Sequence, residues 1–225
     1  MNGCGPKSSQ EPDCRLCHKL VVSRTRIVFP TPCPRGGLLA IGEAPGADED
    51  EVGEGFVGQA GQTLDALLVE HGLERNRDYG VANIVRCRPE NNRKPDKEEI
   101  ANCLPWLVIF LLEWRPSVLL LVGATATEAF MGNGPLLWHI GRSRKSPVLL
   151  AKDAHRSLRP AIRKLHALAG DVYAVPMPHT SGMAWNRKAP NGKPWREIGK
   201  EQVEFAVECL EKSRGKAGRN GLRIV

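Results

Sequence analysis

Four short, nearly unbroken runs of hydrophobic residues recur along the chain, and each is followed by a glycine-rich or polar segment. Apolar runs of this kind are typical of strands that are buried on both faces of a parallel sheet. We therefore expect strands over residues 38–41, 79–85, 118–122 and 172–175.

Hydrophobic residues spaced three and four apart predict helices between these strands. The alternation of strands and helices favours an α/β domain of three layers with a mainly parallel sheet. An Arg- and Ser-rich region at 141–145 lies outside the expected elements. The expected helices begin after Gly61, run from Asp96 to a stop at Pro116, and cover 124–131, 157–168 and about 200–212.

The composition fits one domain over residues 1–225, with 1–13 and 213–225 as flexible tails. No apolar run is long enough to span a membrane, and the first ten residues lack the apolar core of a signal peptide, so we expect a cytoplasmic, monomeric protein. Lys and Arg outnumber Asp and Glu by 32 to 25, giving a net charge of +7, which favours a polyanionic partner such as DNA.

Ligands of such sheets bind beyond the carboxyl ends of the strands. The first of these loops belongs to the stretch GEAPGADEDEVGEGFVGQAG, residues 42–61. Its glycines allow the backbone to approach a ligand, and Phe56 either anchors the loop or stacks on a base. Between its glycine-rich turns lie six carboxylates: Glu43, Asp48, Glu49, Asp50, Glu51 and Glu54.

Two further polar residues follow or end strands at the same edge. Asn83 carries a hydrogen-bond donor beside an acceptor, which complements a pyrimidine edge, although a turn-stabilising role is the simpler interpretation. His179 follows the last strand and could stabilise a leaving-group anion. The other five histidines are interpreted as surface or helix residues: His18, His71, His139, His155 and His166.

Seven cysteines are too few for a disulfide scaffold, and their spacing suggests ligation. Cys14 and Cys17 form a CxxC pair, while Cys87 and Cys103 stand apart, a pattern that fits an iron–sulfur cluster better than structural zinc. The alternative is that the last two are buried apolar residues. The remaining cysteines fit no pair: Cys4, Cys33 and Cys209.

Together these features resemble the iron–sulfur uracil-DNA glycosylases, the fourth family of that superfamily. The resemblance rests on the stretch 42–61, the strand NIVRCRP with its following NRKP, the segment VLLLVGATA, the late histidine and the cysteine spacing, and it covers residues 14 to about 182. It implies a four-stranded parallel sheet, a [4Fe–4S] cluster on the four cysteines and hydrolysis of the bond between a flipped base and deoxyribose in DNA.

The resemblance also implies roles for individual residues. Glu43 and Glu49 match the loop that faces the sugar and the attacking water, and His179 matches the histidine near the pyrimidine O2. Phe56 matches the ring that stacks on the base, and Asn83 matches the residue that recognises the base edge. The implied pocket also includes Gly42 and Ala44. Ala44 stands where the stronger glycosylases of the superfamily have Asp. We interpret Asp50, Glu51 and Glu54 as a solvated rim.

The segment HTSGMAWNRKAPNGKPW, residues 179–195, departs from the family pattern, because Thr180 replaces a proline. We expect Ser181 to contact DNA, and either Met183 or Trp185 to fill the gap left by the flipped base; the alternative is a solvated loop pinned by tryptophans. The cations expected to grip phosphates are Arg187, Lys188 and Lys193.

This departure leaves the base open: uracil is expected, with another deaminated or modified pyrimidine as the alternative. Residues 88–102 lack the histidine-containing insertion of the covalent-trapping relatives, which argues against that variant. Two rival hypotheses are a protein that binds damaged or single-stranded DNA without cutting it, and a zinc-binding DNA module.

Overall fold

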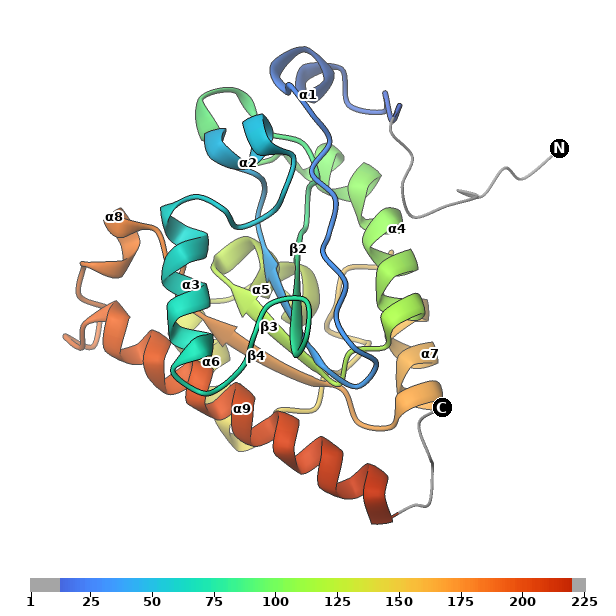
Figure 1. Ribbon diagram of the computed structural model, residues 1–225, viewed down its shortest axis with the longest axis vertical. Helices are drawn as coiled ribbons and strands as arrows, with labels where there is room; N and C mark the ends of the chain where they lie inside the picture. Colours follow the sequence, from blue (N-terminus) through green and yellow to red (C-terminus); the bar gives the residue numbers. More distant parts are fainter. Residues whose placement is uncertain (1–12, 220–225) are drawn as a thin grey trace, which may run out of the picture.

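The protein forms a three-layer α/β/α sandwich in a computed structural model that describes residues 13–219 (Figure 1). All four strands of the sheet run parallel, in the order β2-β1-β3-β4. This arrangement confirms the expected fold class. The strands are β1 (Leu38–Gly42), β2 (Tyr79–Asn83), β3 (Val118–Val122) and β4 (Tyr173–Met177).

Helical segments connect the strands and cover both faces of the sheet, as parallel pairing requires. They are α1 (His18–Ser23), α2 (Ala47–Val52), α3 (Gln59–Val69), the 3-10 turn η1 (Glu90–Asn92), α4 (Lys97–Trp114), α5 (Ala124–Met131), α6 (Leu136–Lys145), α7 (Arg159–Ala169), α8 (Gly182–Trp185) and α9 (Trp195–Arg219).

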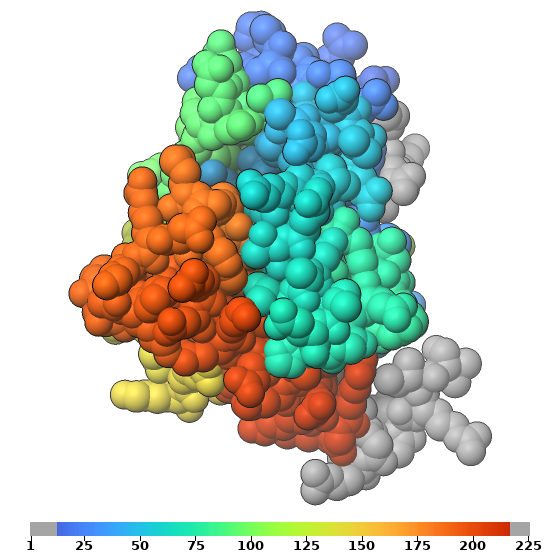
Figure 2. Space-filling model, turned by 60° about the vertical axis from the view of Figure 1, so that its left-hand side comes forward, coloured from blue at the N-terminus to red at the C-terminus, as the bar shows by residue number. Residues whose placement is uncertain are grey.

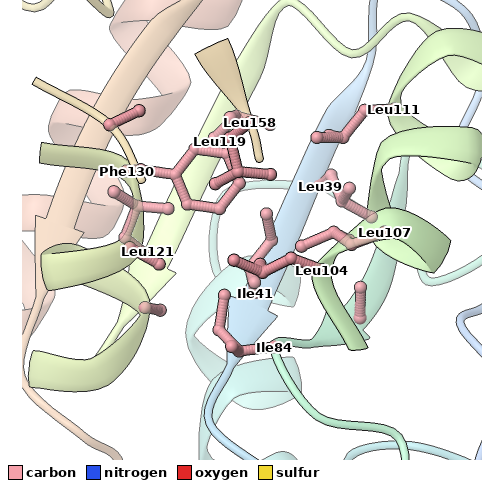
Figure 3. Close-up of a cluster of buried hydrophobic side chains, with 14 of the residues drawn as sticks. Leu39, Ile41, Ile84, Leu104, Leu107, Leu111, Leu119, Leu121, Phe130 and Leu158 are labelled. Carbon is pink, nitrogen blue, oxygen red and sulfur yellow. The ribbon is translucent and has the colours of Figure 1, made fainter. Parts of the chain in front are cut away.

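Alternate residues of each strand face two separate hydrophobic cores. On β1, Leu39 and Ile41 point to the core shared with α4, α5 and α7 (Figure 3), while Leu38 and Ala40 point to the core shared with α3 and α9. Every residue of the four strands is buried. Burial on both faces is the reason that these strands read as continuous hydrophobic runs.

Several boundaries differ from the expectations: β2 ends at Asn83 rather than at residue 85, and β4 covers Tyr173–Met177. The region 141–145 is helical, as the end of α6. Its inward-facing residue Ser143 is polar and donates to the carbonyl of Ala174 at 2.7 Å, so the sequence shows no hydrophobic helical spacing here. The last helix begins earlier, at Trp195, and continues past residue 212 to Arg219, so 213–219 are not a tail.

Ser213 explains part of this extension, because its hydroxyl lies 2.9 Å from that of Ser117, directly before β3. Residues 1–12 and 220–225 of the predicted tails, which include Cys4, lie outside the described residues. His139 is fully buried in α6, which excludes a surface position for it. No helix between residues 13 and 219 has the length and hydrophobicity needed to cross a bilayer.

Candidate active site and cysteine cavity

The carboxyl ends of the four strands bring distant segments to one edge of the molecule. Figure 2 shows the segment around α8, in orange, close to the acidic loop that follows β1, in blue to cyan, and to the segment after β2, in green. The parallel topology is responsible, because each of these segments leaves the sheet at the same end.

Gly42 lies beneath the two residues expected to recognise a base. It pairs in register with Asn83, and a Cβ added to it would lie 2.6 Å from Asn83 Oδ1 and 2.7 Å from Phe56 Cζ. Only a residue without a side chain allows the amide and the ring to approach each other here. The structure thus brings Gly42, Phe56 and Asn83 together, with the half-buried Ala44 nearby in the same loop.

The Asn83 amide is placed to serve a ligand. It is only 9% exposed, yet between residues 13 and 219 its side chain makes no hydrogen bond. Buried amides in proteins normally have partners, so an amide that lacks them within the fold is a candidate for binding a ligand. A structural turn role, the simpler interpretation of the sequence, has no hydrogen bond to support it.

Glu43 is anchored by the helix that follows β3. The hydroxyl of Thr125, in the first turn of α5, donates a short hydrogen bond to Glu43 Oε2. The amino end of a helix also favours a nearby carboxylate. One oxygen of Glu43 is therefore fixed, while Oε1 has no hydrogen-bond partner in the described part of the chain.

Glu49 holds the acidic loop together. Its Oε2 accepts the Gly46 N–H at 3.0 Å and its Oε1 accepts the Gly58 N–H at 2.9 Å, which joins the two glycine-rich turns. Both oxygens of this buried carboxylate are thus occupied by backbone. No local pattern around Glu49 indicates this structural role, and a direct catalytic part for Glu49 stays a prediction.

The burial of Asp50 contradicts the prediction that it belongs to a solvated rim. It is 2% exposed, and its carboxylate accepts the backbone N–H groups of Thr25 and Arg26 at 2.9–3.1 Å. A carboxylate at this depth needs such partners to offset its lost hydration. Glu51 and Glu54 are exposed, as expected.

His179 is held as a neutral hydrogen-bond donor. The Ser181 N–H donates to its Nδ1 at 3.0 Å, so the single proton of a neutral ring resides on Nε2. Burial lowers the pKa of His179 below 6.5, against the opposing effect of the Glu43 and Glu49 charges. The ring lies against Gly123 after β3, where an added Cβ would be 3.2 Å from its Cδ2.

The two proposed wedge residues have different surroundings. Met183 is 78% exposed on α8. Trp185 instead packs against α9, since a Cβ on Gly199 would lie 2.3 Å from its ring. Thr180, which replaces the family's proline, is buried and donates to the Ala60 carbonyl at 2.6 Å.

The rest of this segment forms an ordered hairpin-like loop. The Trp195 N–H donates to the Arg187 carbonyl at 2.9 Å, and the Ala189 N–H donates to that of Lys193 at 2.8 Å. Arg187 and Lys188 are exposed, while Lys193 pairs with Glu201 of α9. Two of the three expected phosphate-binding cations are therefore open to solvent.

The four spaced cysteines line one small cavity between α1, the segment after β2 and α4. Arg24 Nη1 donates to Cys87 Sγ at 3.0 Å and Arg86 N to Cys103 Sγ at 3.3 Å. Burial raises the pKa of the Cys103 thiol to about 11. In the described part of the chain, no three His, Cys, Asp or Glu side chains are arranged to hold a single metal ion.

Comparisons with known proteins agree with this geometry. A family model described as the uracil DNA glycosylase superfamily matches residues 29–201. Three similar relatives, each named a type-4 uracil-DNA glycosylase, come from Pyrobaculum aerophilum, Archaeoglobus fulgidus and Thermotoga maritima.

They are 43%, 40% and 39% identical to this chain over 42%, 51% and 52% of its length. The matches span 48%, 57% and 60% of the relatives' own lengths, so the chain covers about half of the curated relatives it matches. They confirm the family 4 resemblance for that part of the chain. The family model covers most of the fold and all four strand ends, and the chain therefore belongs to the uracil DNA glycosylase superfamily.

Proposed function

We propose that this protein hydrolyses the bond between uracil and deoxyribose in DNA. The relatives it resembles are named type-4 uracil-DNA glycosylases. The observation that carries the proposal is the pocket edge made by Asn83, Phe56 and Gly42, at the same end of the sheet as the neutral His179. An amide with a free donor and acceptor complements the O4 and N3–H of uracil, and the flat ring of Phe56 offers a stacking surface.

The reaction divides charge between two sides of the site. When the C1′–N1 bond breaks, its electron pair goes to the base and the sugar becomes oxocarbenium-like. The His179 Nε2–H donates to the O2 of the leaving anion, and the Glu43 carboxylate stabilises the sugar cation. Water then adds to C1′ and passes a proton to Glu43. Transfer of this proton through solvent to the uracil anion gives neutral uracil, an abasic site and the regenerated Glu43 carboxylate.

A neutral histidine suits this task. Burial keeps His179 uncharged near neutral pH, so it acts by donating a hydrogen bond rather than by releasing a proton. Thr125 fixes one oxygen of Glu43 and leaves the other for the water or the sugar. We propose that Glu49 acts as a second carboxylate: its charge acts on His179, and its hydrogen bonds to the backbone shape the loop.

The four cysteines are proposed to hold a [4Fe–4S] cluster. They share one cavity, and the sulfurs of Cys87, Cys103 and Cys17 accept hydrogen bonds from Arg24, Arg86 and Asn102. One close pair with two separate cysteines is the spacing that favours a cluster over structural zinc. When bound, the cluster would supply a structural cross-link between the amino-terminal segment and α4. Nothing in the hydrolysis requires it as a reactant.

DNA is proposed to lie across the edge that carries α8. Met183 is the proposed wedge, because it is the exposed one of the two candidates, and Ser181, Arg187 and Lys188 are proposed to contact the backbone. Extruding a base costs about a few kcal/mol, least at a mispair. Uracil opposite guanine is therefore the expected preferred duplex substrate.

The test is base release from matched oligonucleotides that contain uracil opposite guanine, uracil opposite adenine, uracil in a single strand, hypoxanthine or a modified cytosine, read as breakage after alkali. Release of uracil by the wild type and its loss in Glu43→Ala and His179→Ala would support the proposal. Release of another base alone would assign specificity to the divergent 179–195 segment. Binding without release of any base would favour the non-cutting alternative.

A further inference from the structure

Phe56 adopts a backbone conformation that a bulky residue rarely accepts. Its φ of 59° lies in the left-handed region. This conformation costs about 1–3 kcal/mol for a non-glycine residue and persists only where the surrounding structure holds it. The start of α3 presses on the same turn, since a Cβ on Gly61 would lie 1.9 Å from the Phe56 carbonyl oxygen. This strained turn is what directs the ring toward Gly42 and Asn83.

One arginine clamps the strained turn from outside the pocket. Arg75 Nη1 donates to the Gly55 carbonyl at 3.0 Å and Nη2 donates to the Phe56 carbonyl at 2.8 Å. Two nitrogens of the planar guanidinium each bond one of two successive carbonyls, a fixed geometry that the single nitrogen of a lysine ammonium does not reproduce. The side chain is 15% exposed, so these bonds are shielded from competing water.

The clamp is itself held in place. Arg75 lies 3.5 Å from Glu54 and 3.3 Å from Asp65 of α3, and the Tyr79 hydroxyl donates to Asp65 at 2.6 Å. Burial and then the Asp65 carboxylate raise the pKa of Tyr79, which keeps its hydroxyl protonated as a donor. The network therefore connects the first residue of β2, helix α3 and the strained turn.

We propose that Arg75 is a positioning residue for base recognition: it holds Phe56 in the left-handed conformation that places the ring against the base. The inference rests on the proposed function for the role of the ring, but the clamp itself is a feature of the fold. Arg75 contacts the backbone carbonyls of the turn and the carboxylates of Glu54 and Asp65. We expect its effect on the base site to pass through Phe56, the one of these residues whose side chain lies against Gly42. Without the two guanidinium hydrogen bonds, the turn at Phe56 relaxes and the Phe56 ring moves away from Gly42.

The experiment compares Arg75→Lys with the matched control Arg77→Ala, an exposed arginine two residues away that pairs with Glu74 and Asp78. Rates of uracil release under single turnover and affinities for an abasic-site duplex are measured in wild-type and Phe56→Ala backgrounds. We expect R75K to slow release on the order of 10- to 100-fold, with unchanged abasic-duplex affinity and no further loss in the Phe56→Ala background.

Equal losses in both backgrounds would assign Arg75 a general structural role and overturn the proposal, as would wild-type rates in R75K. Crystal structures of the wild type and R75K give a readout independent of activity. A Phe56 φ that leaves the left-handed region in R75K supports the clamp, and an unchanged φ overturns it. If the wild type releases no base, the proposed function fails, and this structural comparison still decides the clamp.

Discussion

Substitution of Gly42 by alanine separates the geometry of the base site from the stability of the fold. The new Cβ would lie 2.6 Å from Asn83 Oδ1 and 2.7 Å from Phe56 Cζ, so these atoms must move about 0.8 and 0.7 Å to reach the 3.4 Å of ordinary contact. Both are the ends of side chains, which can shift without moving the backbone. Overpacking of this kind costs about 1–3 kcal/mol, less than the roughly 5–15 kcal/mol that holds a typical domain folded.

The consequence for activity is larger, because a misplacement near 1 Å can cost about 100-fold in rate. We expect Gly42→Ala to reduce single-turnover uracil release by that order while it still melts cooperatively and binds abasic DNA. The control is Gly141→Ala in α6, where an added Cβ meets nothing within 4 Å. Release by Gly42→Ala within about twofold of wild type would refute the proposed site geometry.

Three other predictions follow from the structure. Met183→Ala should slow release from duplex more than from single strands, because only a duplex leaves a gap to fill, whereas Trp185→Ala should mainly lower the melting temperature; rates and thermal denaturation check both. Burial lowers the pKa values of His139 and His179 below 6.5, so the unfolded chain binds more protons as the pH falls. The free energy of unfolding should therefore be constant above about pH 7.5 and fall toward about pH 5.5 in denaturant titrations, less so in His139→Phe. Chelation of iron from the loaded protein should bleach its visible absorbance and lower its melting temperature, and an unchanged melting temperature would contradict a structural cluster.

The strands could be predicted because burial on both faces leaves few polar residues in them. Asn83 was noticeable for the same reason, as a polar residue in a buried strand, and parallel topology then placed it beside the loop after β1, at the same end of the sheet as the loop after β4. Helix α6 could not be assigned, because its inward face carries His139 and Ser143 rather than a hydrophobic stripe.

The residues that support the site were not visible in the sequence. Asp50 is one of six acidic residues in its loop, and only its burial against the backbone of Thr25 distinguishes it from its neighbours. Arg75 and Thr125 act on partners 19 and 82 residues away, Phe56 and Glu43, through contacts that no local pattern records. Such pairings depend on how the elements pack in three dimensions.

The most direct test of the proposed uracil recognition by Asn83 is the rate of uracil release from a duplex with uracil opposite guanine. The rate is measured for the wild type, Asn83→Ala and the control Asn133→Ala. Asn133 is exposed after α5, away from the strand ends. We expect release by the wild type and the control, and a loss on the order of 100-fold in Asn83→Ala with unchanged affinity for abasic DNA. Equal rates for all three proteins would contradict it.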